Sequence, residues 1–196
     1  MEQQTLIIGK KAPPIGAPPS IVLIDPRFAH NVGMVVRLAS CYGLSQVWYT
    51  GDRVQMEIES RGKLPREERM KGYRDVEMIQ FDRPLEQFKN VTPVAIEVRP
   101  NSERLQDFEH PKNAVYIFGP EDGSIPQSIL RLCYRFVIIP TRNHYCLNLA
   151  TATATILWDR AIKLNEVPSE IPDQTYAETN PEEMGLYSGQ NTWPKV

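Results

Sequence analysis

The feature that most constrains the fold is an alternation between short apolar runs and segments whose apolar residues recur with helical spacing. We expect buried strands at 21–24, 46–49, 76–81, 94–98, 114–118 and 136–139. Helical patterns lie between some of them, at about 31–42, 84–89 and 126–133. Strands that alternate with helices are typical of an α/β domain with a mainly parallel sheet flanked by helices.

Two helices carry recognisable end signals. Asn31 is placed to cap a helix that runs to about Tyr42, and Gly43 follows where a C-terminal cap belongs. A last long helix is expected over 147–164, with Asn148 as its cap. The run 151–155 alternates threonine and alanine as a strand does, but the length and the cap favour a helix.

The 196 residues fit one domain, which we place at 20–165. A proline-bearing arm (1–19) precedes it, and an acidic, proline-containing tail (166–196) follows. The three cysteines form no CxxC pair, so we expect neither a disulfide framework nor a metal site, and a cytoplasmic location. Neither a secretory signal nor an apolar run long enough to span a membrane is evident.

The net charge of −2 does not indicate a general affinity for nucleic acid, so any such affinity must be local. One stretch, 61–74, carries six basic and two acidic residues. Its basic residues are candidate phosphate contacts: Arg61, Lys63, Arg66, Arg69, Lys71 and Arg74. A solvated helix face with internal charge pairs explains the same composition equally well.

Three of the expected strands run into polar loops that open helices. Because ligands collect at the carboxyl ends of parallel strands, these loops should meet in space. The loops are NVGMVVR (31–37), FGPEDG (118–123) and the segment from IIP (138–140) to CLNLA (146–150). Each taken alone is also explained as a tight turn or a helix cap.

Taken in order, the three motifs resemble those of the SpoU branch of the SPOUT RNA methyltransferases, over about 20–165. The resemblance implies a trefoil-knotted α/β fold that binds S-adenosylmethionine in the knot. It also implies an enzyme that methylates a ribose 2′-hydroxyl of RNA. Family members are typically homodimers with the active site near the dimer interface. A chain without an evident extra RNA-binding domain favours a compact target such as tRNA, with rRNA as the other candidate.

The resemblance assigns roles residue by residue. The candidate catalytic residues are Arg37, Asn31, Glu121 and Asn148. The candidate cofactor-binding residues are Val98, Gly119, Gly123, Ile139, Cys146 and Leu147. His144, in the third loop, is a candidate RNA contact together with the basic stretch, and its neighbour Tyr145 is a further candidate for contact with a base or ribose.

This sequence differs from the family pattern at two places. Cys146 stands where serine is usual, and Ser124-Ile125 stands where Gly-Leu is usual. The chemistry of Arg37 also has two interpretations. The family arginine is proposed as a general base, but a guanidinium is effectively always protonated. A clamp on the substrate phosphate that stabilises the developing alkoxide is the alternative.

Three other functions compete with ribose methylation. A base-methylating SPOUT enzyme fits poorly with the Asn31-to-Arg37 motif. A catalytically silent RNA-binding module fits poorly with the joint presence of Asn31, Arg37, Glu121 and Asn148. A generic nucleotide-binding domain is disfavoured because the sequence contains neither GxGxxG nor a P-loop.

Overall fold

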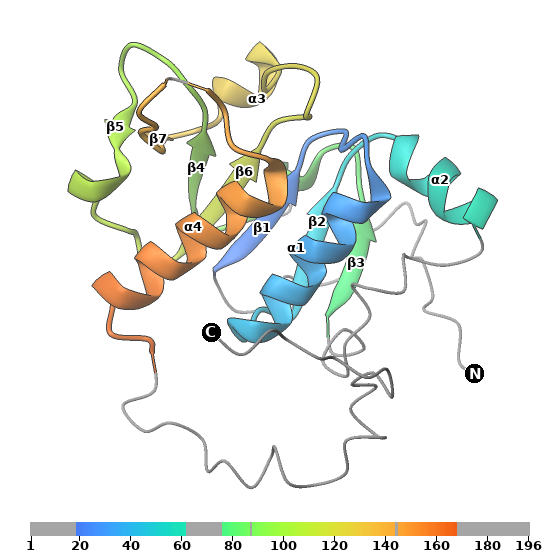
Figure 1. The fold of residues 1–196 in the computed structure, drawn as a ribbon, viewed down its shortest axis with the longest axis horizontal. Helices are drawn as coiled ribbons and strands as arrows, with labels where there is room; N and C mark the ends of the chain where they lie inside the picture. Colours follow the sequence, from blue (N-terminus) through green and yellow to red (C-terminus); the bar gives the residue numbers. More distant parts are fainter. Residues whose placement is uncertain (1–18, 62–75, 87, 144, 168–196) are drawn as a thin grey trace, which may run out of the picture.

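A parallel sheet forms the centre of the molecule in the computed structural model, which describes residues 19–61, 76–86, 88–143 and 145–167 (Figure 1). Its strand order is β3-β2-β1-β6-β4-β7-β5, and every neighbouring pair is parallel. The strands are β1 (Ser20–Leu23), β2 (Gln46–Tyr49), β3 (Glu77–Gln80), β4 (Thr92–Ile96), β5 (Glu103–Arg104), β6 (Ala114–Phe118) and β7 (Arg135–Ile138). The α/β fold with a mainly parallel sheet is confirmed; the trefoil knot stays a prediction.

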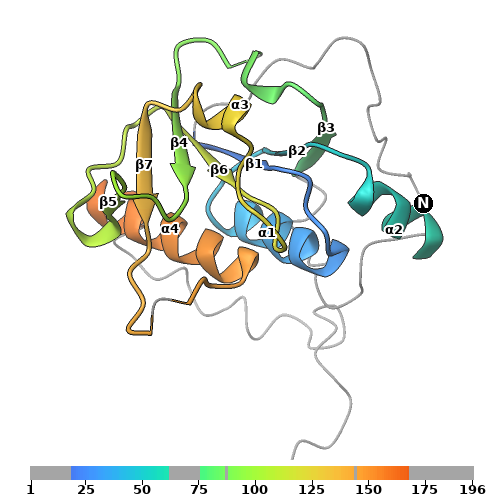
Figure 2. The same ribbon diagram turned by 90° about the horizontal axis from the view of Figure 1, so that it is seen from above.

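Helices cover both faces of this sheet. The helical elements are α1 (Ala29–Cys41), α2 (Arg53–Arg61), η3 (Pro84–Glu86), η4 (Leu105–Asp107), α3 (Gln127–Leu130) and α4 (Leu149–Lys163). Figures 1 and 2 show α1 and α4 side by side on one face, with α3 on the other. No helix in the described ranges is long and apolar enough to cross a membrane.

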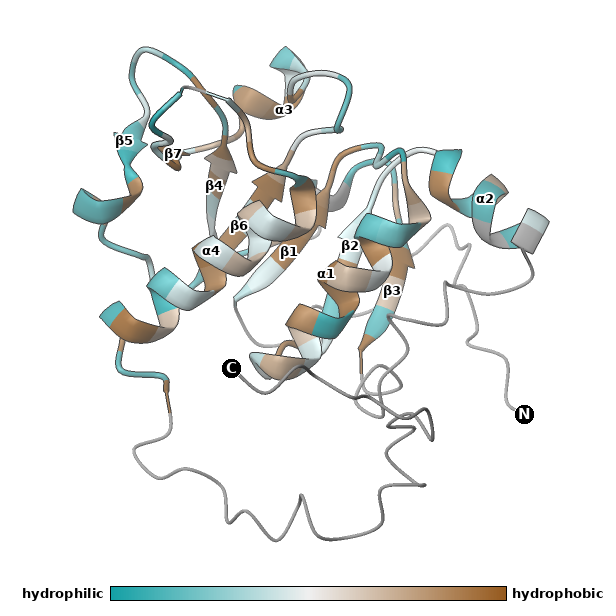
Figure 3. Ribbon diagram, viewed as in Figure 1, coloured by the Kyte–Doolittle hydropathy of each residue, from teal (hydrophilic) through white to brown (hydrophobic). Residues whose placement is uncertain are grey.

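The central strands β1 and β6 are almost wholly apolar because both of their faces are buried. Ile21 and Leu23 of β1 pack with α1 and α4, whereas Val22 points to the second core, which includes Ile125 and Leu130. All five residues of β6 are buried. Figure 3 shows apolar colour along much of β6, and apolar and polar residues in turn along α1 and α4.

The six strands expected from the sequence all form; β2 and β6 have the predicted bounds, and the ends of the other four differ by one or two residues. The sequence missed α2 and β5, since α2 has few apolar residues and β5 is a two-residue polar edge strand. The expected helices at 84–89 and 126–133 are only the short η3 and α3. The arm 1–19 and the tail 166–196 lie almost wholly outside the described residues.

The start of α1 corrects one sequence prediction. Asn31 does not cap this helix, which begins at Ala29 and has Phe28 at the cap position without a side-chain cap hydrogen bond. Instead, the backbone N–H of Ala29 donates to Glu57 Oε2 of α2, at 2.6 Å. A carboxylate at a helix N-terminus satisfies a free donor and complements the helix dipole. Asn31 is thereby left for another role. At the other end, Gly43 has φ +72° and ends the helix as expected.

The last long helix, α4, forms as predicted. Asn148 Oδ1 caps it by accepting the backbone N–H groups of Ala150 and Thr151, at 2.9 and 3.4 Å. Thr153 and Thr155 each donate a hydroxyl to the carbonyl four residues earlier, both at 2.9 Å. These bonds satisfy the hydroxyls within the helix, so the threonine-rich run does not need a strand.

A buried polar cluster fixes the far end of α4 to β6. His110 lies between the Tyr116 hydroxyl (2.6 Å) and Asp159 Oδ2 (2.8 Å). Arg160 donates to the carbonyl of Pro111 (2.7 Å) and to the Tyr116 hydroxyl (3.3 Å). Burial lowers the pKa of His110, although the hydrogen bond to Asp159 opposes that shift. Burial likewise raises the pKa of Tyr116 to about 12.

His110 should therefore make stability depend on pH. Because its pKa is lower in the folded chain than in the unfolded chain, the unfolded chain takes up a proton first as pH falls below about 6.5. We expect His110→Gln to flatten the slope of unfolding free energy against pH in this range, by at most about 1.4 kcal/mol per pH unit. The slope is obtained by measuring the free energy of unfolding in urea at several pH values. Thr155→Ala, which removes a hydroxyl of α4 that does not titrate in this range, is the control and should keep the wild-type slope.

Candidate active site

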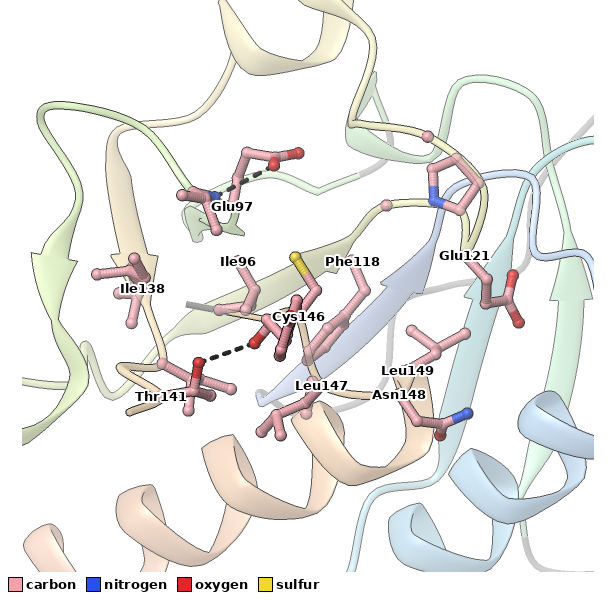
Figure 4. A pocket seen from close by; sticks show the side chains of 18 of the residues that line it. Ile96, Glu97, Phe118, Glu121, Ile138, Thr141, Cys146, Leu147, Asn148 and Leu149 are labelled. Atoms are coloured by element: carbon pink, nitrogen blue, oxygen red, sulfur yellow. Dashed lines mark hydrogen bonds between the residues drawn. The ribbon is translucent and has the colours of Figure 1, made fainter. Parts of the chain in front are cut away.

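The three polar loops that follow β1, β6 and β7 converge, as predicted, on one cavity at the carboxyl ends of the strands. Its volume is about 760 Å³, within the range of small-molecule sites. Ile96 and Phe118 form part of its floor, and Leu147 and Leu149 approach from the start of α4 (Figure 4). The cavity thus combines an apolar floor with backbone from several loops.

The six candidate cofactor-binding residues all line this cavity. They are Val98, Gly119, Gly123, Ile139, Cys146 and Leu147. Their side chains are small or apolar, apart from the thiol of Cys146. These six positions therefore offer a ligand mainly apolar surface and backbone groups. Cys146 is exposed, and its thiol stands where the family usually places a hydroxyl.

The loop after β6 packs tightly where it differs from the family pattern. A Cβ at Gly119 would lie 3.2 Å from both Ile125 Cγ1 and the Ile125 backbone nitrogen, so a side chain fits poorly. Ile125 is buried, and its N–H donates to Glu97 Oε2 at 2.9 Å. Glu97 thus holds the turn, and Ile125 fills the apolar position. Gly119 is needed here for close packing rather than for a positive φ.

Three of the four candidate catalytic residues form one hydrogen-bonded chain at the cavity. Asn148 Nδ2 donates to Asn31 Oδ1 at 3.0 Å, and Asn31 Nδ2 donates to Glu121 Oε1 at 2.7 Å. The bonds join residues 117 and 90 positions apart in the sequence. Glu121 Oε2 also accepts the backbone N–H of Arg27, at 2.8 Å. The three motifs are therefore linked through their own side chains.

The orientation of this chain is set from α4. Asn148 Oδ1 accepts the first N–H groups of the helix, which leaves its Nδ2 as the donor toward Asn31. Asn31 must then accept at Oδ1 and donate at Nδ2, and Glu121 must accept. Asn31 is buried yet lines the cavity. Its amide keeps one N–H and one lone pair for a ligand.

Arg37, the fourth candidate, is not brought to this cavity. It is exposed on α1, and among the described residues no hydrogen bond or ion pair holds its guanidinium. Asn31 and Arg37 are six positions apart on a helix, so their side chains point in different directions. Within one chain, the described structure therefore assembles Asn31, Glu121 and Asn148 without Arg37.

A second set of charged residues, absent from the sequence prediction, fixes the loops beside Glu121. Arg53, at the start of α2, donates to both oxygens of Asp122, at 2.9 and 3.1 Å, and also donates to the carbonyl of Asp25. Its Nε lies 3.0 Å from Asp25 Oδ2 in an ion pair without hydrogen-bond alignment. The hydrogen bond from Arg53 lowers the pKa of Asp122. Arg53 thus connects the loops after β1 and β6.

The stretch 62–74 and His144 lie outside the described residues, and of Arg61 only the backbone at the end of α2 is described. The sequence prediction also missed several residues that line the cavity, among them Phe28, Glu97 and Arg104, whereas Tyr145 of the third loop was a candidate. Phe28 and Glu97 lie within three residues of predicted site positions, so the strand-end rule, applied to whole loops, would have found them.

The fold and this site define a class of α/β proteins. Their cavity lies at the carboxyl ends of the parallel strands, and three polar motifs converge on it. The SpoU rRNA methylase family matches residues 18–158. The chain belongs to this family of RNA methyltransferases, which use S-adenosylmethionine as methyl donor. No curated protein matches the sequence.

Solved structures share the fold. An rRNA methyltransferase from Sinorhizobium meliloti superposes with a TM-score of 0.58 at 19% identity, covering 74% of this chain and 56% of that one. The chain therefore spans little more than half of that enzyme. AviRb, a SpoU methyltransferase from Streptomyces viridochromogenes in complex with S-adenosylmethionine, superposes with a TM-score of 0.60 at 16% sequence identity. The match covers 79% of this chain and 61% of that one. A structure concerned with 2-OH methylation of C/U34 on tRNA superposes with a TM-score of 0.64 at 22% sequence identity. The match covers 80% of this chain and 94% of that one.

The hydrogen-bonded chain can be tested by exchanging an amide for a carboxylate. Asn31→Asp places two carboxylates next to each other, and we expect it to destabilise the fold by about 2 kcal/mol at pH 7. The variant should regain stability as pH falls and one carboxyl is protonated. Adding Glu121→Gln should recover most of the stability lost at pH 7, since the new amide can donate to the carboxylate introduced at position 31. Urea unfolding measures the free energy of unfolding of both variants. An equal loss of this free energy in Asn31→Asp and in the double variant would contradict the hydrogen-bonded chain.

Proposed function

We propose that the chain transfers a methyl group from S-adenosylmethionine to a ribose 2′-hydroxyl of RNA, with tRNA favoured over rRNA as substrate. The observation that carries this proposal is the chain from Asn148 through Asn31 to Glu121, which joins the three family motifs beside the cavity. The similarity to the structure concerned with 2-OH methylation on tRNA supports it, since the two chains match over 94% of that protein.

The cavity suits the cofactor in size and chemistry. Its volume of about 760 Å³ accommodates a nucleoside with an amino-acid side arm. Ile96, Phe118 and Ile139 offer apolar surface to an adenine ring, and the loop at Gly119 offers backbone groups at close range. When bound, S-adenosylmethionine supplies an activated methyl group on a sulfonium. The residues of the chain then have to position the hydroxyl that receives it.

Asn31 is the residue best placed to orient the substrate hydroxyl. Its position is fixed on both sides, by Asn148 and Glu121, and its amide retains one donor and one acceptor. A hydroxyl that donates to Asn31 Oδ1 is held in one direction without cost of reorganisation during the reaction. Glu121 acts through Asn31 and is a positioning residue, because its two oxygens already accept from Asn31 and Arg27.

Arg37 enters this proposal through a second copy of the chain. It is exposed and outside the cavity of its own chain, and α1 and α4 carry further exposed apolar side chains on the same side of the sheet, Met34, Trp158 and Ile162. A two-fold dimer formed through these helices would bury that surface and bring Arg37 toward the partner's cavity. There its guanidinium would clamp a substrate phosphate or act on the hydroxyl proton.

The function is tested by incubating tRNA and rRNA separately with labelled S-adenosylmethionine and mapping any 2′-O-methyl mark. Incorporation at one ribose of tRNA is the expected result. A methyl group on a base would assign the base-methylating alternative. Cofactor and RNA binding without any incorporation would assign the catalytically silent RNA-binding module.

Arg37 gives a specific kinetic prediction. Arg37→Ala should lower the methylation rate by about 100-fold or more while cofactor affinity stays within about twofold. Arg37→Lys should retain part of the rate if the residue is a phosphate clamp, since the charge is kept. If Arg37 instead takes the proton, the lysine variant should shift the pH–rate profile. Arg131→Ala, on the exposed end of α3, is the control and should behave as the wild type.

Mixing two variants that are each expected to lose activity tests whether Arg37 acts across a dimer. Glu121→Gln should lose activity by itself because it removes one of the two carboxylate oxygens that accept from Asn31 and from the Arg27 backbone. Arg37→Ala and Glu121→Gln, combined in equal amounts and allowed to exchange, should regain roughly a quarter of wild-type activity, because each mixed dimer has one intact site. No recovery, with mixed dimers demonstrated by mass spectrometry, would show that both residues act within one chain.

A further inference from the structure

An exposed aromatic ring stands at the mouth of the cavity. Phe28 lines the cavity although 46% of its surface is exposed. It immediately precedes α1 and is three positions before Asn31, so the two side chains project from neighbouring positions at the start of the helix. A nucleotide whose ribose lies against Asn31 therefore has its base within reach of Phe28.

The ring of Phe28 is held in place by Arg27. The Arg27 guanidinium carbon lies 5.1 Å from the centroid of the Phe28 ring, in a cation–π contact. Arg27 is itself fixed by Asp122 Oδ2 at 3.3 Å from Nη1 and by Glu121 Oε2, which accepts its backbone N–H. Phe28 and Arg27 together form a platform at the cavity. This platform is held by the same loop, after β6, that holds Asn31 in position. Its flat ring and planar cation form a surface suited to a stacked base.

A second exposed aromatic, Tyr145, lines the same cavity from the loop between β7 and α4. Its side chain is 78% exposed. The backbone of this loop is held by Thr141, whose hydroxyl donates to the Tyr145 carbonyl at 2.9 Å. No ring contact to Tyr145 is present in the parts of the chain that the structure describes. Two rings at one cavity therefore remain open to a ligand.

We propose that Phe28, backed by Arg27, and Tyr145 bind the base of an unpaired RNA nucleotide at the cavity entrance. This inference rests on the proposed function and adds the conformation of the substrate: the target ribose belongs to a nucleotide that is outside a duplex. A base in a helix is already stacked on its neighbours, whereas a base in a loop or single strand has its faces free for an aromatic side chain. Every base has such a face, so the platform should distinguish unpaired from paired nucleotides but should not distinguish one base from another.

Binding of a fluorescent RNA tests the platform directly. The probes are a 12-nucleotide single strand with one central 2-aminopurine and the same strand in a duplex. With the full chain, the single strand should bind more tightly, and its 2-aminopurine fluorescence should fall on stacking. Phe28→Ala and Tyr145→Ala should each weaken single-strand binding about 10-fold and reduce the quenching, and Phe28→Trp should restore both.

Three controls separate the possible outcomes. Leu132→Ala removes an equally exposed apolar side chain away from the cavity and should not change RNA affinity. Cofactor affinity, measured in every variant, should fall less than RNA affinity in Phe28→Ala and Tyr145→Ala, and a loss of cofactor affinity as large as the loss of RNA affinity would contradict the inference. Sedimentation should show that the oligomeric state is also unchanged. If Phe28→Ala weakens a dimer instead of RNA binding, the ring belongs to a contact between copies and the inference is wrong.

The result also distinguishes this inference from the proposed function. If the wild type methylates RNA and both alanine variants bind the single strand as tightly as it does, the platform is wrong and the methyltransferase function stands. If the duplex binds as tightly as the single strand, selection for an unpaired nucleotide is wrong. If the wild type binds and methylates no RNA, both proposals fall together.

Discussion

The hydrogen-bonded chain from Asn148 to Asn31 to Glu121 is the interaction on which the site depends. It joins the start of α4, the first turn of α1 and the loop after β6, which are far apart in the sequence. Asn148 caps α4 with one end of its amide and orients Asn31 with the other. The helix cap and the candidate catalytic group are therefore one structure, and a change in either affects both.

The parallel sheet is what brings these groups together. All its neighbouring strands run in one direction, so the loops after β1, β4, β6 and β7 leave at the same edge. Helices on both faces bury the central strands β1, β2 and β6, which leaves the edge at the strand ends as the place where polar groups can gather. Arg53 then connects two of these loops, through Asp25 and Asp122, and keeps the loop that carries Glu121 beside Asn31.

The expectations that succeeded were those that depend on local pattern. Buried strands such as β6 appear as apolar runs, and Asn148 was identified as a cap because its role at α4 is local. Asn31 looked like a cap for the same reason, but Glu57 from α2 satisfies the helix end instead. The helix α2 has little apolar pattern, so the carboxylate it contributes had no local signal in the sequence.

The sequence by itself determined the α/β fold, the family and nine catalytic or cofactor-binding candidates among the residues that line the cavity, because apolar periodicity and ordered motifs are properties of adjacent residues. Tertiary structure alone decided which side chains meet. It linked Asn31 to Glu121 and Asn148, left Arg37 exposed outside the cavity, and placed Phe28 at its mouth. The physical reason is that hydrogen bonds across 90 or more residues depend on the packing of helices on a sheet, which no local pattern specifies.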